Sequence, residues 1–441
     1  MSSAYGIMKD RKAALNLTTM KGELPMEMHE NAQKLQKALL VGIDTGEYDA
    51  EGSMEELREL VKSSGAEPAA IMMQKRDKPD GATCVGSGRI EEIREFCEQN
   101  DIDFIVFDTE LSPTQIRNIE DATNVRTIDR TMLILDIFAL RARTNEGKLQ
   151  VELAQLKYLM PRLTGKGREM SRLGGGVGTR GPGETKLETD KRHIRRRIEY
   201  LKNALSEMTE RRDRRREKRR KDGVVTVAIV GYTNAGKSTL MNTLTQARVL
   251  SEDKLFATLD PTSRALRLPC GFSVMMIDTV GLVRRLPHHL VEAFRSTLEE
   301  AAEADIILNV CDASSEEYRL HLEVTETLLR ELGCTEKPII PVFNKCDLVS
   351  DPDDLPRDKE AVRICAKYAK GIDELLAAIE DNLPVKLKAF KLLIPFDKAG
   401  LLSVLRSAGA LRSEEYTAEG IAAEALVEEP LWHKVEPYSV K

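Results

Sequence analysis

Residues 225–245 read VTVAIVGYTNAGKSTLMNTLT and decide the fold class. An apolar stretch, 225–230, leads directly into Gly-Tyr-Thr-Asn-Ala-Gly-Lys-Ser at 231–238, and an amphipathic stretch follows. This is the GxxxxGK[ST] phosphate-binding loop between a strand and a helix, the context that the motif requires. A bare match can arise by chance in a long chain, but these flanks argue against that reading. The stretch therefore predicts an α/β P-loop domain, Ras-like in its order of elements.

The residue types of this loop match what a nucleotide triphosphate needs. Glycines let backbone N–H groups close on phosphate oxygens, and the helix start adds its dipole. Lys237 is expected to neutralise the β- and γ-phosphates and to assist catalysis, while Ser238 is expected to offer its hydroxyl to Mg²⁺. The predicted nucleotide-binding residues here are Gly231, Tyr232, Thr233, Asn234, Ala235, Gly236, Lys237, Ser238 and Thr239.

A second apolar stretch, SVMMIDTVG at 273–281, ends in a DxxG motif. A DxxG motif alone is weak evidence for a nucleotide site, but its position at a strand end downstream of a P-loop makes it good evidence. Asp278 is expected to hold Mg²⁺ through water, and the Gly281 N–H is expected to sense the γ-phosphate, which makes Gly281 a candidate catalytic residue. The predicted nucleotide-binding residues are Asp278, Thr279, Val280 and Gly281.

The nucleotide base is indicated by PIIPVFNKCDLV at 338–349, a strand that ends in an NKxD motif. The Asp347 carboxylate can accept hydrogen bonds from both N1–H and the 2-amino group of guanine, a donor pair that adenine lacks. The motif therefore favours GTP over ATP. Asn344 is expected to brace the P-loop and Lys345 to lie along the base. The predicted base-binding residues are Asn344, Lys345, Cys346 and Asp347.

Two further segments complete the predicted site. ICAK at 364–367 is similar to the SAK turn of GTPases, with Cys365, Ala366 and Lys367 as candidates and the Ala366 N–H expected to meet guanine O6. FATLDPT at 256–262 is the candidate switch I. Thr258 is expected to give Mg²⁺ its second hydroxyl and to assist catalysis; Thr262 is the competitor, or both cap a turn before a proline. The predicted switch I residues are Phe256, Ala257, Thr258, Leu259 and Asp260.

The site lacks a group that orients the attacking water. Leu282 stands where Ras-like GTPases have glutamine, and a leucine cannot orient water. Intrinsic hydrolysis is therefore expected to be slow, with an ordering group supplied by another segment or a partner. Asn234 either shapes the loop or, as in similar GTPases, binds K⁺. His288 and His289 are alternative bases, but a solvated switch II turn is the favoured explanation for them.

The composition indicates a soluble protein of several domains. The chain has 441 residues, 41% of them hydrophobic, and a net charge of −6, and its seven scattered cysteines suggest reduced thiols in the cytoplasm. Neither a signal peptide nor a membrane span is expected. The predicted domains are an N-terminal extension (1–34), a small α/β domain (35–130), a helical hairpin (131–222), a G domain (223–383) and an α+β unit (384–441).

In the first α/β domain, apolar runs alternate with amphipathic stretches, which predicts a parallel sheet. Ser53 with Glu56 is expected to form a capping box at a helix start, and Ser112-Pro113 marks another. Residues 130–162 are predicted to be helical throughout.

The predicted hairpin has a glycine-rich loop and a basic arm. Residues 165–190 contain eight glycines and almost no large apolar side chain, so they are expected to form a mobile loop. Residues 186–221 hold 16 Lys/Arg against 7 Asp/Glu. The run is either a surface for RNA phosphates or a solvated helix. Its apolar positions have helical spacing and are expected to pack on the preceding helix: Ile194, Ile198, Leu201, Leu205 and Met208.

Several stretches together resemble the HflX family of ribosome-associated GTPases. They are VGSGRIEEI (85–93), GKLQVELAQLKYLMPRL (147–163), GGGVGTRGPGETKLETDKR (174–192), FATLDPT (256–262) and DTVGLVRRLPHHLVEAFRSTLEE (278–300). The resemblance covers most of the chain; the first 30 or so residues and the C-terminal unit fit less clearly.

The resemblance implies a GTPase that binds the large ribosomal subunit and its RNA near the peptidyl transferase centre, and that in some members splits stalled or idle ribosomes. It implies GTP/GDP and Mg²⁺ as ligands, ribosome-stimulated hydrolysis, no membrane partner and a monomer off the ribosome. It also places the glycine-rich loop at the RNA-facing tip of the hairpin. The candidate RNA-contacting residues are Arg168, Arg172, Gly174, Gly175, Gly176 and Arg180.

Two other functions remain open. In the first, the chain is a nucleotide-gated RNA-binding or 50S assembly factor in which hydrolysis is incidental. In the second, residues 85–93 serve as a phosphate loop of an ATP-dependent RNA remodeller, but they contain neither the lysine nor a GxGxxG pattern.

Overall fold

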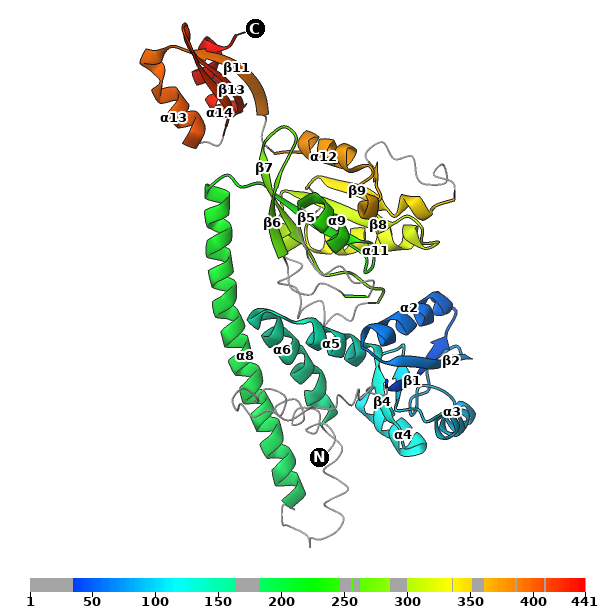
Figure 1. Cartoon of the computed structure of the whole chain (residues 1–441). Coiled ribbons are helices and arrows are strands. Elements are labelled where there is room, and N and C mark those ends of the chain that lie inside the picture. The colour runs from blue at the N-terminus through cyan, green and yellow to red at the C-terminus, as the bar shows by residue number, and fades with distance from the viewer. Residues whose placement is uncertain are drawn as a thin grey trace, which may run out of the picture. The chain divides into compact units, whose positions relative to one another are not determined.

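The computed structural model describes residues 35–163, 182–245, 255–256, 262–285, 300–334, 336–350, 361–384, 387–407 and 410–440. Within these residues the chain forms three sheets, each with its own helices, and a helical arm (Figure 1). The α/β fold class predicted from the sequence is confirmed. The predicted domain limits remain a prediction. None of the described helices is long and apolar enough to cross a membrane.

The first sheet is parallel and has the strand order β2-β1-β3-β4. Its strands are β1 (Lys37–Asp44), β2 (Glu67–Lys75), β3 (Phe104–Phe107) and β4 (Arg126–Asp129). Alternate residues of β1 and β3 are buried on opposite faces, as the two-residue period of a strand requires. One core contains residues of α2 (Ala50–Ser63) and α5 (Arg130–Arg141), and the other residues of α3 (Ser87–Asn100) and α4 (Pro113–Thr123).

The two predicted helix starts had different outcomes. Ser112 caps α4 with a complete capping box and Pro113 in the first turn, as expected. The capping box at Ser53 is wrong, because α2 begins a turn earlier, where the Asp49 side chain accepts a hydrogen bond from the Gly52 N–H. Ser53 instead donates to Asp108 Oδ2 over 2.7 Å. The side chains of Ser53 and Glu56 therefore form tertiary contacts and do not cap the helix.

The long helix predicted for 130–162 is two helices. α5 ends at Arg141, and α6 (Asn145–Arg162) begins after Thr144, whose side chain accepts from the Gly147 N–H. α5 packs into the core of the first sheet through Leu133, Ile134 and Phe138, and the same core includes Val151 and Ala154 of α6. A threonine side chain that caps a new helix start competes with continued helix, which a purely apolar periodicity does not reveal.

The arm consists of α6 and α8 (Pro182–Lys221), and the predicted packing between them is confirmed. Leu153 of α6 lies with Ile198 and Leu201 of α8 in one apolar cluster, which Ile194 and Leu205 flank. Met208 is not part of it. The helices run antiparallel, since Arg197 pairs with Glu152 and Arg212 with Glu146. The glycine-rich loop, with its six candidate RNA-contacting residues, lies outside the described residues.

The second sheet has the order β10-β9-β8-β5-β7-β6, parallel except for β6. Its elements are β5 (Thr226–Gly231), α9 (Lys237–Thr245), β6 (Thr262–Arg267), β7 (Ser273–Asp278), β8 (Ile306–Asp312), α11 (Tyr318–Glu331), β9 (Ile339–Asn344), β10 (Val362–Arg363) and α12 (Ile372–Asp381). The P-loop, DxxG and NKxD motifs follow β5, β7 and β9, so all three meet at the carboxyl edge of one sheet.

The third sheet is antiparallel, with the order β11-β13-β12. It is formed by β11 (Leu387–Ile394), β12 (Leu411–Thr417) and β13 (Gly420–Glu428), with α13 (Gly400–Ser407) and α14 (Glu429–Val435) completing its core. This agrees with the α+β unit expected at the C-terminus.

Candidate functional site

Two glycines of the P-loop hold backbone angles that other residues rarely adopt. Gly231 has φ +153°, and a Cβ there would lie 2.0 Å from the Val310 carbonyl oxygen; Gly236 has φ +90°, and its Cβ would meet the Asn344 amide nitrogen at 2.2 Å. Asn234 also has a positive φ, 60°. The loop can therefore close only with small residues at 231 and 236, as a phosphate cradle requires.

Lys237 lies inside this loop. Its ammonium donates to the carbonyl oxygens of Gly231 (3.0 Å) and Tyr232 (2.7 Å). An ammonium has three donors, so one remains for a phosphate oxygen. Burial lowers the pKa of Lys237 to about 8, and Asp278 opposes that shift. The bound phosphates would favour the charged form further.

Ser238 and Asp278 form the candidate Mg²⁺ position. Ser238 Oγ lies 2.9 Å from Asp278 Oδ2, and Asp278 is fully buried at the end of β7. A hydroxyl beside a buried carboxylate at the phosphate end of a P-loop suits a hard divalent cation. The second predicted hydroxyl, Thr258, lies outside the described residues, as do Ala257, Leu259 and Asp260.

The other DxxG residues mainly contact protein. Thr279 donates its hydroxyl to the Ile229 carbonyl oxygen over 2.7 Å, and Val280 packs in the core shared with α2 and α5. Their predicted role in nucleotide binding is thus restricted to the backbone. Gly281 has no room for a side chain, because a Cβ there would lie 2.6 Å from the Thr233 methyl and 3.2 Å from the Lys237 ammonium.

Leu282 is bound to the P-loop through its backbone. Its N–H donates to the Gly231 carbonyl oxygen (3.2 Å), and its carbonyl oxygen accepts from the Thr233 N–H (2.7 Å). The side chain is buried with Val230 and Ile307. Residue 282 is the first residue of switch II, the segment 282–299 that follows the DxxG motif and of which the structure describes 282–285. Residue 282 therefore fastens the start of switch II to the P-loop and presents no polar group to a water.

Phe256 corrects the predicted switch I. Its ring is buried and lies edge-to-face on Phe138 of α5, with the ring centroids 4.6 Å apart. The preceding Leu255 N–H donates to Ser63 Oγ of α2 over 3.0 Å. The Phe256 ring is therefore part of the contact with the first α/β unit, which leaves only its backbone for the predicted nucleotide contact. His288 and His289 lie outside the described residues.

The base-binding motif is tied to the P-loop through Asn344. Its amide donates to the Ala235 carbonyl oxygen (2.8 Å), and its Oδ1 accepts from the Ala366 N–H (2.9 Å). The Ala366 N–H was expected to meet guanine O6. In this structure it donates to Asn344 instead. Lys345, at φ 62°, forms an ion pair with Asp312 over 2.7 Å.

The cysteines of this region have protein partners. The Cys346 thiol donates to the Phe343 carbonyl oxygen over 3.2 Å. Cys365 lies beside the Asp347 carboxylate, and burial, with a smaller contribution from Asp347, raises the pKa of its thiol. Cys365 thus takes the place of the SAK serine next to the residue that is expected to bind guanine.

A cluster of charged residues that the sequence did not reveal adjoins the P-loop. We call it the Tyr232 cluster: Tyr232, Glu56, Asp108, Arg130 and Arg284. The Arg130 guanidinium pairs with Glu56 and lies 2.8 Å from Asp108 Oδ1, and all three side chains are at least 91% buried. Glu56 was misassigned to a helix cap, and no local motif marks Arg130 or Arg284 as its partners.

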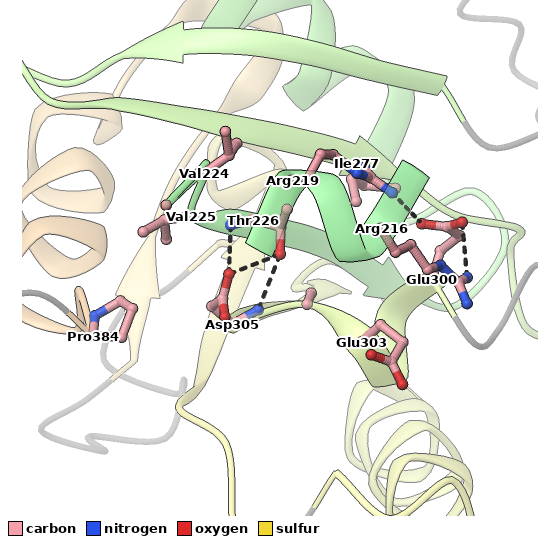
Figure 2. Close-up of a pocket in the computed structure, with 12 residues that line it drawn as sticks. Arg216, Arg219, Val224, Val225, Thr226, Ile277, Glu300, Glu303, Asp305 and Pro384 are labelled. Atoms are coloured by element: carbon pink, nitrogen blue, oxygen red, sulfur yellow. Dashed lines mark hydrogen bonds and ion pairs between the residues drawn. The ribbon is translucent and has the colours of Figure 1, made fainter. Parts of the chain in front are cut away.

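A second cluster surrounds Glu300, which lies in the helical stretch 300–303 that follows switch II. The Glu300 carboxylate lies 2.8 Å from Arg216, 3.8 Å from Arg219 and 3.9 Å from Arg212, all on α8. Figure 2 shows Arg216 and Arg219 reaching toward Glu300, beside a cavity of about 210 Å³. Thr226, at the start of β5, also lines this cavity. The cavity is therefore at the opposite end of β5 from the P-loop.

Comparison with known families agrees with this geometry. Three family models match: "GTP-binding GTPase N-terminal" at residues 51–139, "GTP-binding GTPase Middle Region" at 141–219 and "50S ribosome-binding GTPase" at 226–345. The first two models meet at about residue 140, where α5 gives way to α6.

Curated relatives cover nearly the whole chain. A GTPase HflX of Caldanaerobacter subterraneus subsp. tengcongensis is 48% identical over 91% of this chain and 93% of its own. The GTPase HflX of Escherichia coli is 41% identical, over 89% and 91%. Among solved structures, a GTP-binding protein from Sulfolobus solfataricus in complex with GDP matches at 24% identity and a TM-score of 0.43, over 79% of this chain and 98% of that one. The chain belongs to the HflX family and is a GTP-binding, GTP-hydrolysing enzyme.

Proposed function

We propose that this GTPase docks on the large ribosomal subunit in its GTP state, that docking speeds GTP hydrolysis, and that hydrolysis releases it. Its task would be to split or rescue stalled or idle ribosomes in the cytoplasm, where it would otherwise be a monomer. The single observation that best supports an RNA partner is that α8 carries paired arginines on one face and unpaired cations on another.

One face of α8 is satisfied by protein: Arg212 pairs with Glu146, and Arg216 with Glu300. A neighbouring face carries Arg211, Arg215 and Lys218, which are exposed and have no carboxylate partner among the described residues. These three recur at a helical spacing of four and three, so they form one stripe. A row of unpaired cations on a rigid helix suits the phosphates of folded RNA, which proteins read by shape and charge.

In the proposed mechanism, Lys237 and the P-loop amides hold the phosphates, and the Gly281 N–H contacts the γ-phosphate. Ser238 and Thr258 would hold Mg²⁺, with Asp278 acting through water, and the ion would neutralise charge on the transferred phosphoryl group. Asp347 would select guanine. Because Leu282 orients no water, the group that completes catalysis would come from the ribosome or from K⁺ bound near Asn234.

Co-sedimentation with purified 50S and 70S particles tests the docking. Binding to 50S is expected in a non-hydrolysable GTP analogue and not in GDP, and 70S particles are expected to separate into subunits. Binding without 70S separation, and without stimulation of hydrolysis by 50S subunits, would instead support an assembly factor. Equal binding in both nucleotides would overturn a GTP-gated cycle.

Charge variants test the role of α8. The pair Arg211→Gln and Arg215→Gln is expected to weaken 50S binding and to reduce the slope of log affinity against log salt by about 2. Arg58→Gln with Arg94→Gln is the charge-matched control; these arginines of α2 and α3 are half-exposed and each is paired with a glutamate of its own helix. Equal effects of the two pairs would exclude α8 as the contact.

Turnover in Na⁺ in place of K⁺ tests the cation. A marked decrease in the rate is expected if Asn234 helps to hold K⁺, and an unchanged rate discards that role.

A further inference from the structure

We infer that Tyr232 is a positioning residue for GTP hydrolysis: its hydroxyl, held by Glu56 of α2, sets where switch II begins and so where Gly281 meets the γ-phosphate. The inference rests on the GTPase activity of the chain and not on the ribosome as partner.

Tyr232 stands between the P-loop and switch II. It is 5% exposed, and its backbone forms an isolated parallel bridge with Leu282. Its hydroxyl accepts a hydrogen bond from the Arg284 N–H over 2.6 Å. The backbone hydrogen bonds to Leu282 come from Gly231 and Thr233, the neighbours of Tyr232, while the Tyr232 hydroxyl holds the Arg284 N–H.

The hydroxyl proton of Tyr232 is donated to Glu56. The other carboxylate oxygen of Glu56 pairs with Arg130. Arg130 in turn donates to the Arg284 carbonyl oxygen over 3.3 Å. The Arg284 N–H is thus bound by Tyr232, and the Arg284 carbonyl oxygen is bound by Arg130. The Glu56 carboxylate connects Tyr232 with Arg130.

The side chain of Arg284 adds a further contact with α2 at its N-terminus. Its guanidinium lies 3.0 Å from Asp49 Oδ2 and also pairs with Glu317. Arg285 pairs with Asp108 over 3.0 Å. Residues 284 and 285 are therefore held by the first α/β unit, while residue 282 is held by the P-loop.

The ring and the hydroxyl of Tyr232 have separable tasks. The ring stacks on His321, with centroids 3.9 Å apart and planes 16° apart, and packs with Val230 and Leu282. Tyr232→Phe keeps this packing and removes only the hydrogen bonds to Glu56 and Arg284. Catalysis depends on the position of Gly281 within a fraction of an ångström, so loosening residues 282–284 is expected to slow the chemical step.

Single-turnover GTP hydrolysis by the full-length protein without ribosomes tests the inference. Tyr232→Phe and Glu56→Gln are each expected to lower the rate about tenfold while GDP affinity stays within about twofold. The double variant is expected to lose about tenfold and not a hundredfold, because both changes break one linkage. Tyr158→Phe is the matched control, since Tyr158 is also buried and its hydroxyl lies beside a carboxylate of the first α/β unit, that of Asp129.

Thermal unfolding of each variant separates positioning from simple stability. A variant that melts earlier yet turns over at the wild-type rate well below its melting temperature would overturn the inference, as would a hundredfold loss in the double variant. If Tyr232→Phe does not fold, Glu56→Gln, which keeps a hydrogen-bond acceptor, serves for the rate and affinity comparison. A protein that hydrolyses GTP normally but ignores ribosomes would refute the proposed function and leave this inference standing.

Discussion

The ion pairs near the two ends of switch II differ in how deeply they are buried and in how many arginines share a carboxylate. The Tyr232 cluster at its start is almost completely buried, and Arg130 is the main cation of both of its carboxylates, Glu56 and Asp108. The Glu300 cluster beyond its end is partly open to water, and three arginines share one carboxylate. Burial makes a charge costly to leave unpaired, whereas redundancy makes any one partner dispensable. The start of switch II should therefore tolerate little change, while its connection to α8 should tolerate more.

The largest effect is expected for Arg130→Met. The substitution leaves the Glu56 and Asp108 carboxylates buried without their main cation, which should lower the free energy of unfolding by about 3–5 kcal/mol. Urea unfolding followed by circular dichroism measures it. A loss below about 1 kcal/mol would show that water reaches the Tyr232 cluster and that the contrast with the Glu300 cluster does not hold.

A smaller loss is expected for Glu300→Gln. Three arginines lose their shared carboxylate, but Arg212 keeps Glu146 and all three side chains are partly solvated. The cost should be about 1–2 kcal/mol. The same urea titration gives the value, with Glu146→Gln as the control within the arm. A cost equal to that of Arg130→Met would contradict the proposed difference.

His321 reports how well the Tyr232 ring is shielded from water. Burial, helped by Arg284, lowers the pKa of His321 to about 4, so the folded chain keeps it neutral while the unfolded chain protonates it near pH 6.5. The unfolded state then binds more protons, and stability should fall as pH decreases from 6.5 toward 4. The loss is at most about 1.4 kcal/mol per pH unit and less where water screens the ring.

His321→Phe keeps the ring stack and removes this titration. The stability difference between wild type and variant should therefore shift in favour of the variant as pH decreases from 7 to 5, measured by melting temperature in matched buffers. A difference that is independent of pH would mean that His321 is solvated, and with it the edge of the Tyr232 cluster.

The smallest effect is expected for Arg219→Met. Its guanidinium is 3.8 Å from Glu300, which keeps Arg216 at 2.8 Å. The loss should be less than about 0.5 kcal/mol. A loss above about 1 kcal/mol in the urea titration would show that the three arginines act together and are not redundant.

The candidate nucleotide site was largely predictable because its signals are local. Gly231 and Gly236 are required by backbone angles, and Asp347 by the donor pattern of guanine, and each stands in a short motif at a strand end. The predictions that failed were also local. The switch I motif predicts that Phe256 contacts the nucleotide, but its ring packs in the core against Phe138. Glu56 was assigned to a helix cap that Asp49 provides.

The sequence by itself determined the parallel sheets, the P-loop between β5 and α9, the base-binding motif and the apolar seam of the arm, because each depends on residue spacing within one element or turn. Only the tertiary structure decided that residues 283–285 and 255–256 contact the first α/β unit, and that Glu300 is held by α8. The partners Tyr232 and Glu56 are 176 positions apart. A buried charge chooses its partner by proximity in the folded chain, and sequence spacing carries no information about that choice.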